Sequence, residues 1–474
     1  MFARVLLMAV VVGVGTASAS AANERAGTLP LEECVRMALR EHPQLHAAAA
    51  MVDGSRQRVR QAASGFLPQV AGEYAVNRQS STLGAIIGVP PLGSITSAPG
   101  IDDQTLLFNF QRGMLSLSQL LFDFGKTLNA TRAATADVDS AQSERQALEQ
   151  RVALNVKRAY FDLIAARRLL EVAEGNEANT REHLAEAMDR LGIGLGTSFD
   201  VRKQSVQVAN AELATLTARN NVALGRENLR HAMGLRQPIA FEADDTALDY
   251  VRVVLDEPSA IRAAEARRPE LQRVYALERA QQERIAALKK DYLPVIGGNA
   301  RYAGSGSDGP EQESWFIGGS ARLTIFNGGQ TAAKVAEARA DLLRLEGEKE
   351  AARQLVEFEV RHSLLNLTRA GDALRVSATA AEEATASLAL ARHRYSAGLG
   401  NVLELTDAQN EVANAQANHV RLLADYRIAL ADLEHATATQ LVRNQGEAAA
   451  NEPADDLAGS ADPRALTGRP APAR

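Results

Sequence analysis

Two acidic side chains follow a glycine-rich turn near the end of the chain. Glu404 and Asp407 are three residues apart, and Asp200 matches Glu404 in an earlier stretch of similar sequence. Residues three apart share one face of a helix. Around a symmetry axis such carboxylates would form rings that attract cations to a constriction. The alternative is a solvated face, or charges placed near the positive end of a helix dipole.

Other residue patterns that carry chemistry are missing. The sequence has no phosphate-binding loop ending in Gly-Lys-Ser/Thr, no HExxH, no GxSxG and one cysteine. Gly192, Gly194 and Gly196 imitate a nucleotide loop, but they follow a helical pattern instead of a strand. The eight histidines show no ligand spacing. We therefore predict no enzyme activity, no catalytic residue, no metal site and no cofactor.

The acidic residues belong to a tandem repeat, and an internal repeat must be recognised before the fold can be predicted. Gly125 matches Gly329, and Arg190 matches Arg394, at a constant offset of 204 positions. Each copy begins with a short motif, FDFGKT or FNGGQT. A helical run without proline follows, then the glycine-rich turn and a shorter return helix.

Apolar residues recur every seven positions along both long runs. In the first the seam is interrupted by Glu177, and in the second it slips by four residues between Val356 and Val360. Such a seam predicts a coiled coil, locally unwound at the slip. A helix of about 65 residues would be about 100 Å long, which predicts a rod or tube. The seam residues are Val156, Leu163, Leu170, Leu184 and Leu191, then Val335, Leu342, Val356, Val360, Leu367, Leu374, Ala381, Leu388 and Tyr395.

Alternating apolar and polar residues precede each long helix. They predict β-hairpins at 66–122 and 293–326, the second ending on a strand with Leu323 and Ile325 on its apolar face. Strands of about ten residues suit a tilted membrane span. A soluble, half-buried hairpin is the alternative. The first hairpin carries 22 extra residues in a segment rich in Gly, Pro and Ser, which predicts a long outward loop.

Residues 1–22 have one Arg, an apolar run and then small residues, which together predict a secretory signal peptide. A buried N-terminal helix is the alternative. Cys34 lies too far downstream to carry a lipid anchor, so we expect it to be a buried small residue. The net charge is −6 and no basic stripe is present, so we expect no nucleic-acid partner.

Outside the signal peptide, we expect two structural repeats, an equatorial linker with a strand-like stretch starting at Asp249, and a disordered tail. Short helices at 199–233 and 258–290 would together match one long helix in length and stack beside it. The expected segments are 1–22 signal peptide, 23–235 first repeat with long helix 126–191 and return helix 199–233, 236–257 linker, 258–440 second repeat with long helix 331–396 and return helix 402–435, and 441–474 tail.

Four strands cannot close on themselves, and an open sheet edge cannot face lipid. Two copies of the chain would give eight strands, an interior that side chains fill. Three copies would give twelve strands and a water-filled lumen.

Residues 29–440 resemble the TolC-like outer-membrane efflux proteins. The resemblance rests on the tandem order of LEECVRMALREHPQL, FLPQV, LLFDFGKT, RAYFDLIAA, GIGLGTSFDV, RPEL, YLPVIGG, FNGGQT and RYSAGLGNVLELTDAQNEVANAQ. It implies a mainly α fold with transmembrane β-strands. A homotrimer would share a 12-stranded β-barrel in the outer membrane and a long coiled-coil helical barrel across the periplasm.

The implied function is that of a passive exit duct in a tripartite efflux or type I secretion system. Its partners would be a periplasmic adaptor protein, an inner-membrane transporter and outer-membrane lipid. A structural trimeric coiled-coil surface protein without a channel is the second interpretation, although it has no need of paired strand hairpins.

The resemblance also assigns site residues. It implies that the two turns dock an adaptor, although a tight helix-ending turn alone explains the glycines. It implies further that Glu404 and Asp407 line a periplasmic aperture, since relatives are acidic there. Gly400 lacks the charged side chain that some relatives carry, which speaks against a salt-bridge latch at that position. The docking residues would be Ile193, Gly194, Leu195, Gly196, Ala397, Gly398, Leu399 and Gly400.

Overall fold

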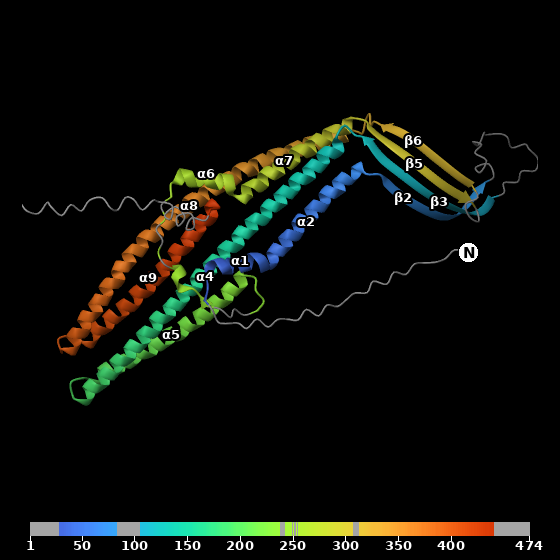
Figure 1. Cartoon of the computed structure of the whole chain (residues 1–474). Coiled ribbons are helices and arrows are strands. Elements are labelled where there is room, and N and C mark those ends of the chain that lie inside the picture. The colour runs from blue at the N-terminus through green and yellow to red at the C-terminus, as the bar shows by residue number, and fades with distance from the viewer. Residues whose placement is uncertain are drawn as a thin grey trace, which may run out of the picture.

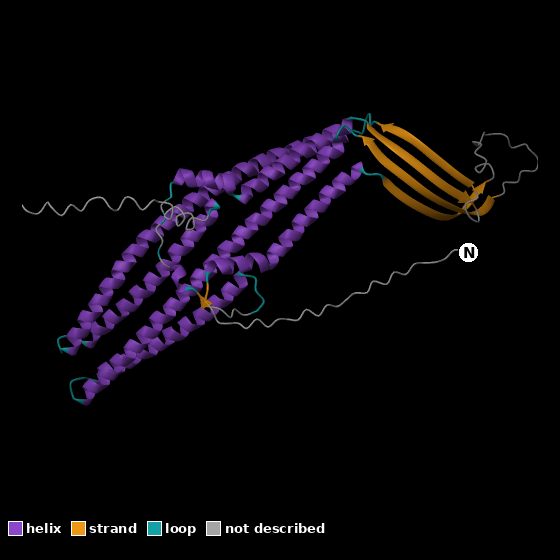
Figure 2. Cartoon of the chain, in the orientation of Figure 1, coloured by secondary structure: helices purple, strands orange, loops and turns teal. Residues whose placement is uncertain are grey.

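The chain forms a long helical rod with a four-stranded sheet at one end and two helical hairpin tips at the other (Figure 1). Figure 2 shows the four long strands beyond one end of the helices and a short strand beside the helices at mid-rod. The computed structural model describes residues 28–82, 105–237, 242–248, 250, 253, 255–306 and 312–439. The predicted signal peptide, most of the predicted outward loop and the predicted tail lie outside these ranges.

Two helices of 67 residues form the rod, α4 (Lys126–Gly192) and α8 (Gln330–Ser396). Shorter helices flank them. These are α1 (Leu31–Glu41), α2 (Pro43–Ala63), α5 (Ser198–Ala232), α6 (Glu257–Arg267), α7 (Pro269–Lys289) and α9 (Val402–Thr437). Three short 3₁₀ segments lie at Ser64–Phe66, Asp245–Leu248 and Lys290–Tyr292.

A buried polar contact starts the first long helix and explains the repeated motif before it. Asp123 accepts hydrogen bonds from the backbone N–H of Gly125 at 2.9 Å and of Thr127 at 2.7 Å. In the second copy Asn327 donates to Thr331 Oγ1 at 2.8 Å. A helix's first N–H groups have no partner inside the helix, so Asp123 stabilises the start of α4, whereas Asn327 contacts a side chain in the first turn of α8.

Prolines divide the short helices at matching places. Pro43 is the first residue of α2 and Pro269 the first of α7, where a missing N–H does no harm. In both cases the preceding residue has an extended backbone, so each proline separates two helices.

The short helices stack end to end, but in a different pairing from the expected one. The end of α5 meets the start of α2, since a Cβ on Gly234 would lie 2.8 Å from His42 and Pro43. The end of α9 meets α7, where Arg268 donates to the His435 carbonyl at 3.2 Å. The expectation that residues 199–233 and 258–290 form one stack was therefore wrong. Each return helix is continued by the short helix of its own copy.

The predicted seam is the buried face of the coiled coil. Val156 and Val360 are fully buried, and Leu163, Leu367 and Leu374 nearly so. The apolar core is densest where α4 passes α1, α5 and α9, around Tyr160 and Ile164. Six seam positions differ from the prediction. Leu345 is buried where Leu342 was expected, and Leu191, at the helix end, is 41% exposed. The other four are half-buried: Leu170, Leu184, Ala381 and Leu388.

The sheet is antiparallel in the order β2 (Gln69–Thr82), β3 (Thr105–Phe122), β5 (Val295–Gly306), β6 (Gln312–Arg322). Its register aligns apolar residues and glycines in rows that cross the four strands. One row runs Val70, Leu117, Ala300, Ile317, and the next runs Gly72, Leu115, Tyr302, Trp315. The opposite face carries Ala71, Ser116, Arg301 and Phe316. One face is therefore apolar, as lipid requires.

The strands depart from expectation at their ends. β6 stops at Arg322, so Leu323 and Ile325 lie beyond the strand predicted to contain them. Gln119, the polar exception on an apolar face, donates to the Phe66 and Leu120 carbonyls at 2.8 Å each. It satisfies backbone groups at the base of the sheet, next to an irregularity between Leu120 and Phe122.

The linker pairs with the N-terminal segment at mid-rod. β1 (Thr28–Leu29) lies parallel to β4 (Glu242–Ala243), and this strand lies earlier in the linker than the one expected from Asp249. Of the expected stretch, residues 250, 253 and 255 are described and are not in a strand. The Tyr160 hydroxyl donates to the Leu29 carbonyl at 2.7 Å and accepts from the Asp244 N–H at 2.8 Å, which fastens this small sheet to α4.

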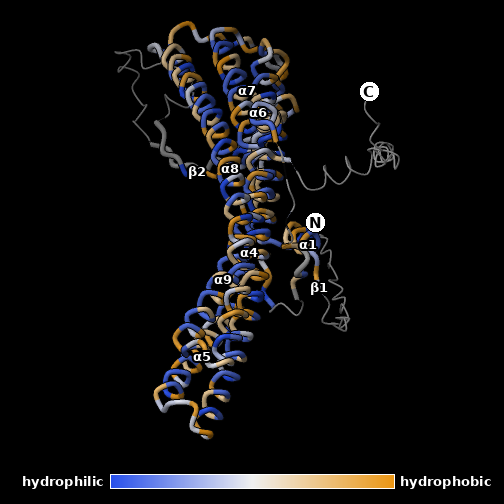
Figure 3. Tube along the Cα trace, turned by 90° about the vertical axis from the view of Figure 1, so that its left-hand side faces the viewer, coloured by the Kyte–Doolittle hydropathy of each residue, from blue (hydrophilic) through white to orange (hydrophobic). Residues whose placement is uncertain are grey.

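Hydrophilic and hydrophobic residues alternate along every helix (Figure 3). Among the helices described, none has a stretch both long and apolar enough to cross a membrane.

Candidate functional site: the periplasmic-type tips and the joint above them

Both hairpin tips have the same backbone geometry. In the first, the Leu195 N–H donates to the Arg190 carbonyl at 2.8 Å and the Gly194 N–H to Leu191 at 3.1 Å. In the second, Leu399 donates to Arg394 at 2.8 Å and Gly398 to Tyr395 at 3.1 Å. This pattern is a Schellman helix end, and it places Gly194 and Gly398 in the left-handed region at φ 76° and 75°.

Apolar side chains at the tips stay uncovered. Ile193, Leu195 and Leu399 are 71%, 70% and 75% exposed. In a Schellman end the residue after the glycine commonly packs back onto its own helix. Here it does not, so the turn geometry explains the glycines but leaves these apolar residues without a structural role.

The return helices begin with side-chain caps that involve two of the three predicted aperture residues. Thr197 and Asp200 form a capping box, with the Asp200 carboxylate 2.9 Å from Thr197 Oγ1 and 3.1 Å from its N–H. Asn401 accepts from the Glu404 N–H at 2.8 Å. Asp200 is therefore committed to starting α5.

Glu404 and Asp407 are both exposed on α9, as their spacing predicts. The Arg394 guanidinium lies 2.9 Å from Glu404 Oε1, within the same hairpin. Gly400 carries no charge, but Arg394, six residues earlier in the last turn of α8, places a positive charge beside Glu404. Sequence reasoning missed this ion pair.

One side chain joins the two hairpins near their tips. Arg190 of α4 donates to the Tyr395 carbonyl of α8 at 3.1 Å and lies 4.7 Å from the centre of the Tyr395 ring. A guanidinium above an aromatic ring is attracted by the ring quadrupole. The repeat pointed to Arg190, because the constant offset aligns it with Arg394. Its contact with Tyr395 could not be predicted from residue spacing.

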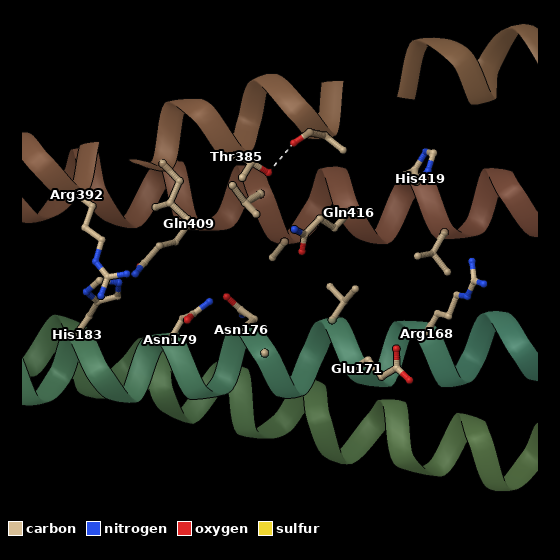
Figure 4. Close-up of a pocket in the computed structure, with 17 residues that line it drawn as sticks. Arg168, Glu171, Asn176, Asn179, His183, Thr385, Arg392, Gln409, Gln416 and His419 are labelled. Carbon is tan, nitrogen blue, oxygen red and sulfur yellow. Dashed lines mark hydrogen bonds between the residues drawn. The ribbon is translucent and has the colours of Figure 1, made fainter. Parts of the chain in front are cut away.

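Polar side chains continue the contact between the hairpins toward mid-rod. Gln204 of α5 donates to Thr406 of α9 at 3.3 Å, and both are almost fully buried. Beyond them, a cavity of about 610 Å³ lies between α4, α8 and α9 (Figure 4). His183 and Arg392 meet at one end of it, and Arg168 and Glu171 lie at the other.

Within the described residues no group of three His, Cys, Asp or Glu side chains could hold a metal ion. What the tips can offer is an exposed apolar surface, exposed carboxylates and a contact between hairpins to which Arg190 and the Gln204–Thr406 hydrogen bond contribute.

Comparison with known proteins agrees with this geometry. The chain is 23% identical to the outer membrane protein TolC of Escherichia coli (strain K12) over 87% of this chain and 84% of TolC. The outer-membrane channel OprN has the same fold, with a TM-score of 0.72, 17% identity and coverage of 87% of this chain and 90% of OprN. CusC, which forms a transmembrane channel, matches with a TM-score of 0.73 at 18% identity, covering 88% of this chain and 95% of CusC. The profile of the outer membrane efflux proteins matches residues 34–235 and 260–439, so both repeats are covered and the chain belongs to the outer membrane efflux protein family, whose members are outer-membrane channels.

Proposed function

We propose that three copies of this chain form the passive exit duct of a tripartite efflux or type I secretion system. The observation that carries the proposal is the unpaired edges of each chain. In the described sheet, β2 pairs with β3 and β6 pairs with β5, and each of these edge strands has its other side open. Because an open edge is unstable in lipid, neighbouring copies must supply the partners. Three copies close twelve strands around a lumen.

The helices support the same assembly. In the half near the tips, α4 packs against α5 and α9, and α8 packs against α9, so α5 and α8 are the outer helices of the layer. Both expose apolar side chains at its edges, for example Leu213 (64%) and Leu216 (61%) on α5 and Leu365 (71%) and Leu390 (64%) on α8. A second copy placed with its α8 against this α5 would bury both sets.

The tips are the proposed docking surface for a periplasmic adaptor, which would connect the duct to an inner-membrane transporter. The exposed Leu195 and Leu399 support this, since apolar residues held at the end of a rigid hairpin suit a protein contact. The chain itself would supply a path and no energy.

Glu404 and Asp407 are the proposed lining of the periplasmic aperture. In a trimer they would form stacked rings of carboxylates that attract cations. Asp200 has a weaker case, because its carboxylate already caps α5.

Trimers reconstituted in planar bilayers test the duct and the aperture together. We expect conductance that divalent cations block from the tip side, and a weaker block in Glu404→Gln with Asp407→Asn. The matched control is Glu382→Gln with Glu383→Gln, an exposed pair of carboxylates on α8 away from the turn. Trimers that conduct no ions would contradict the duct, and an unchanged block would contradict the aperture assignment.

A trimeric coiled-coil surface protein without a channel was the second interpretation. The family assignment and the four-stranded apolar sheet give it no support.

A further inference from the structure

The cavity above the tips contains buried polar atoms that the fold leaves unpaired. His183 of α4 and Gln409 of α9 are each 4% exposed. Within the described residues, His183 Nδ1 and both amide atoms of Gln409 have no hydrogen-bond partner. Figure 4 shows both side chains at the same end of the cavity, beside Arg392. Buried polar groups are nearly always paired, so such a cluster needs an explanation.

This cluster lies where α4 meets the α8/α9 hairpin. At mid-rod the same helices are joined by an apolar core around Tyr160 and Ile164. Nearer the tips the contact surrounds a cavity whose lining mixes apolar and polar side chains, and although the Glu182–Arg392 ion pair crosses it, its unpaired buried atoms weaken it. The two hairpins are therefore held less firmly here than at mid-rod, and a small change in charge can shift the balance.

The charges around His183 come from several helices. Arg392 of α8 is the cation acting on it, and Arg392 is itself bonded to Glu182 of α4 at 2.7 Å. Glu186 Oε2 lies 3.6 Å from His183 Nδ1, too far for a hydrogen bond. From α9 the neighbour is the neutral Gln409. On α5, the carboxylate of Glu212 is bound by Arg181 at 2.9 Å.

The remaining titratable groups of the cavity, Arg168, Glu171 and His419, lie at its far end (Figure 4). Burial, followed by the charge of Arg392, holds the pKa of His183 below its ordinary value against the weaker pull of Glu186 and Glu182. The imidazole is therefore neutral at neutral pH while the hairpins are packed together.

We propose that His183 is a proton-operated release for the contact between α4 and the α8/α9 hairpin, so that mild acid loosens the hairpins above the aperture. The proposal rests on the proposed duct. A proton on His183 creates a buried cation beside the Arg392 guanidinium, which is unfavourable. Separating the hairpins lets water solvate both charges. The cavity already provides room for that water.

The direction of the pH dependence follows from linkage. In separated hairpins His183 is solvated and titrates near its ordinary pKa of about 6.5. Above that pH the packed hairpins keep their full free-energy preference over the separated ones. As the pH falls below it, the preference decreases. The loss is up to about tenfold in the ratio of packed to separated states per pH unit and per subunit. Carboxylates titrate near about pH 4, so a window from about pH 7.5 to 5.5 separates histidines from carboxylates, and the His183→Gln variant then identifies the part due to His183.

The test compares three trimers in planar bilayers across that window: wild type, His183→Gln and His393→Gln. His393 is the matched control, because it is an exposed histidine on α8 near the same tip. We expect the open fraction to rise on acidification, by up to about tenfold per subunit, in wild type and in His393→Gln, and to stay flat in His183→Gln.

Hydrogen exchange of α4 residues 176–187 in the wild-type trimer is the second measurement. After correction for the intrinsic pH dependence of exchange, protection should fall between pH 7.5 and 5.5. A conducting wild type whose open fraction ignores pH would overturn the release, as would an unaltered response in His183→Gln. A wild type that conducts at no pH would contradict the duct, and the exchange measurement would still decide on His183.

Discussion

Arg190 joins the two hairpins one turn before their tips, in addition to the Gln204–Thr406 and Glu182–Arg392 contacts, so its removal should raise the open fraction of the aperture. Arg190→Met keeps an unbranched apolar stem and removes the guanidinium. It deletes the 3.1 Å hydrogen bond to the Tyr395 carbonyl and the stacking of the guanidinium on the Tyr395 ring. The two helices lose their direct connection one turn before each tip.

The size of the effect follows from the two interactions. A hydrogen bond from a charged donor contributes about 1.5–3 kcal/mol when buried, and an exposed cation–π contact about 0.5–1 kcal/mol. Arg190 is half-buried, so solvent screening reduces the sum to about 1–2 kcal/mol per subunit. That corresponds to about a five- to thirtyfold shift toward separated tips in each subunit.

Single-channel recording of trimers gives the open fraction directly. Arg181→Met is the matched control, because Arg181 also lies on α4 but binds Glu177 and Glu212 inside its own hairpin. We expect a raised open fraction in Arg190→Met and wild-type behaviour in Arg181→Met. Equal open fractions in all three would refute the idea that Arg190 holds the tips together.

Three further outcomes are expected. Leu399→Asp should abolish crosslinking to a periplasmic adaptor while trimers remain intact on native gels, because it places a charge on an exposed apolar tip; normal crosslinking would count against docking there. Burial raises the pKa of Cys34 to about 12, so the thiol should resist alkylation in the folded protein at pH 8 and react only after unfolding; rapid labelling of the native trimer would show that α1 does not bury it. Tyr160→Phe should destabilise the linker by about 1–3 kcal/mol, because the Leu29 carbonyl and the Asp244 N–H lose their buried partner; unchanged exchange of the Asp244 N–H would contradict this.

Much of the architecture was readable from periodicity. A seven-residue spacing such as Val360, Leu367, Leu374 is a property of neighbouring turns, and a coiled coil keeps it. Alternation along Val70, Gly72 and Tyr74 likewise sets the two faces of a strand before any partner strand is known. The glycines at positions 194 and 398 marked the tips because only a left-handed residue ends a helix in this way.

Contacts between distant residues decided the rest. The stacking of α5 on α2, the link from Arg190 to Tyr395 and the pairing of β1 with β4 each join segments that no local pattern relates. The same is true of the cavity at His183, where side chains from α4, α8 and α9 meet and both His183 and Gln409 keep unpaired polar atoms. By itself the sequence determined the repeat, the rod and the faces of the strands, because those depend on spacing along one chain. The joints between elements were decided only in the tertiary structure, because they depend on which surfaces packing brings together.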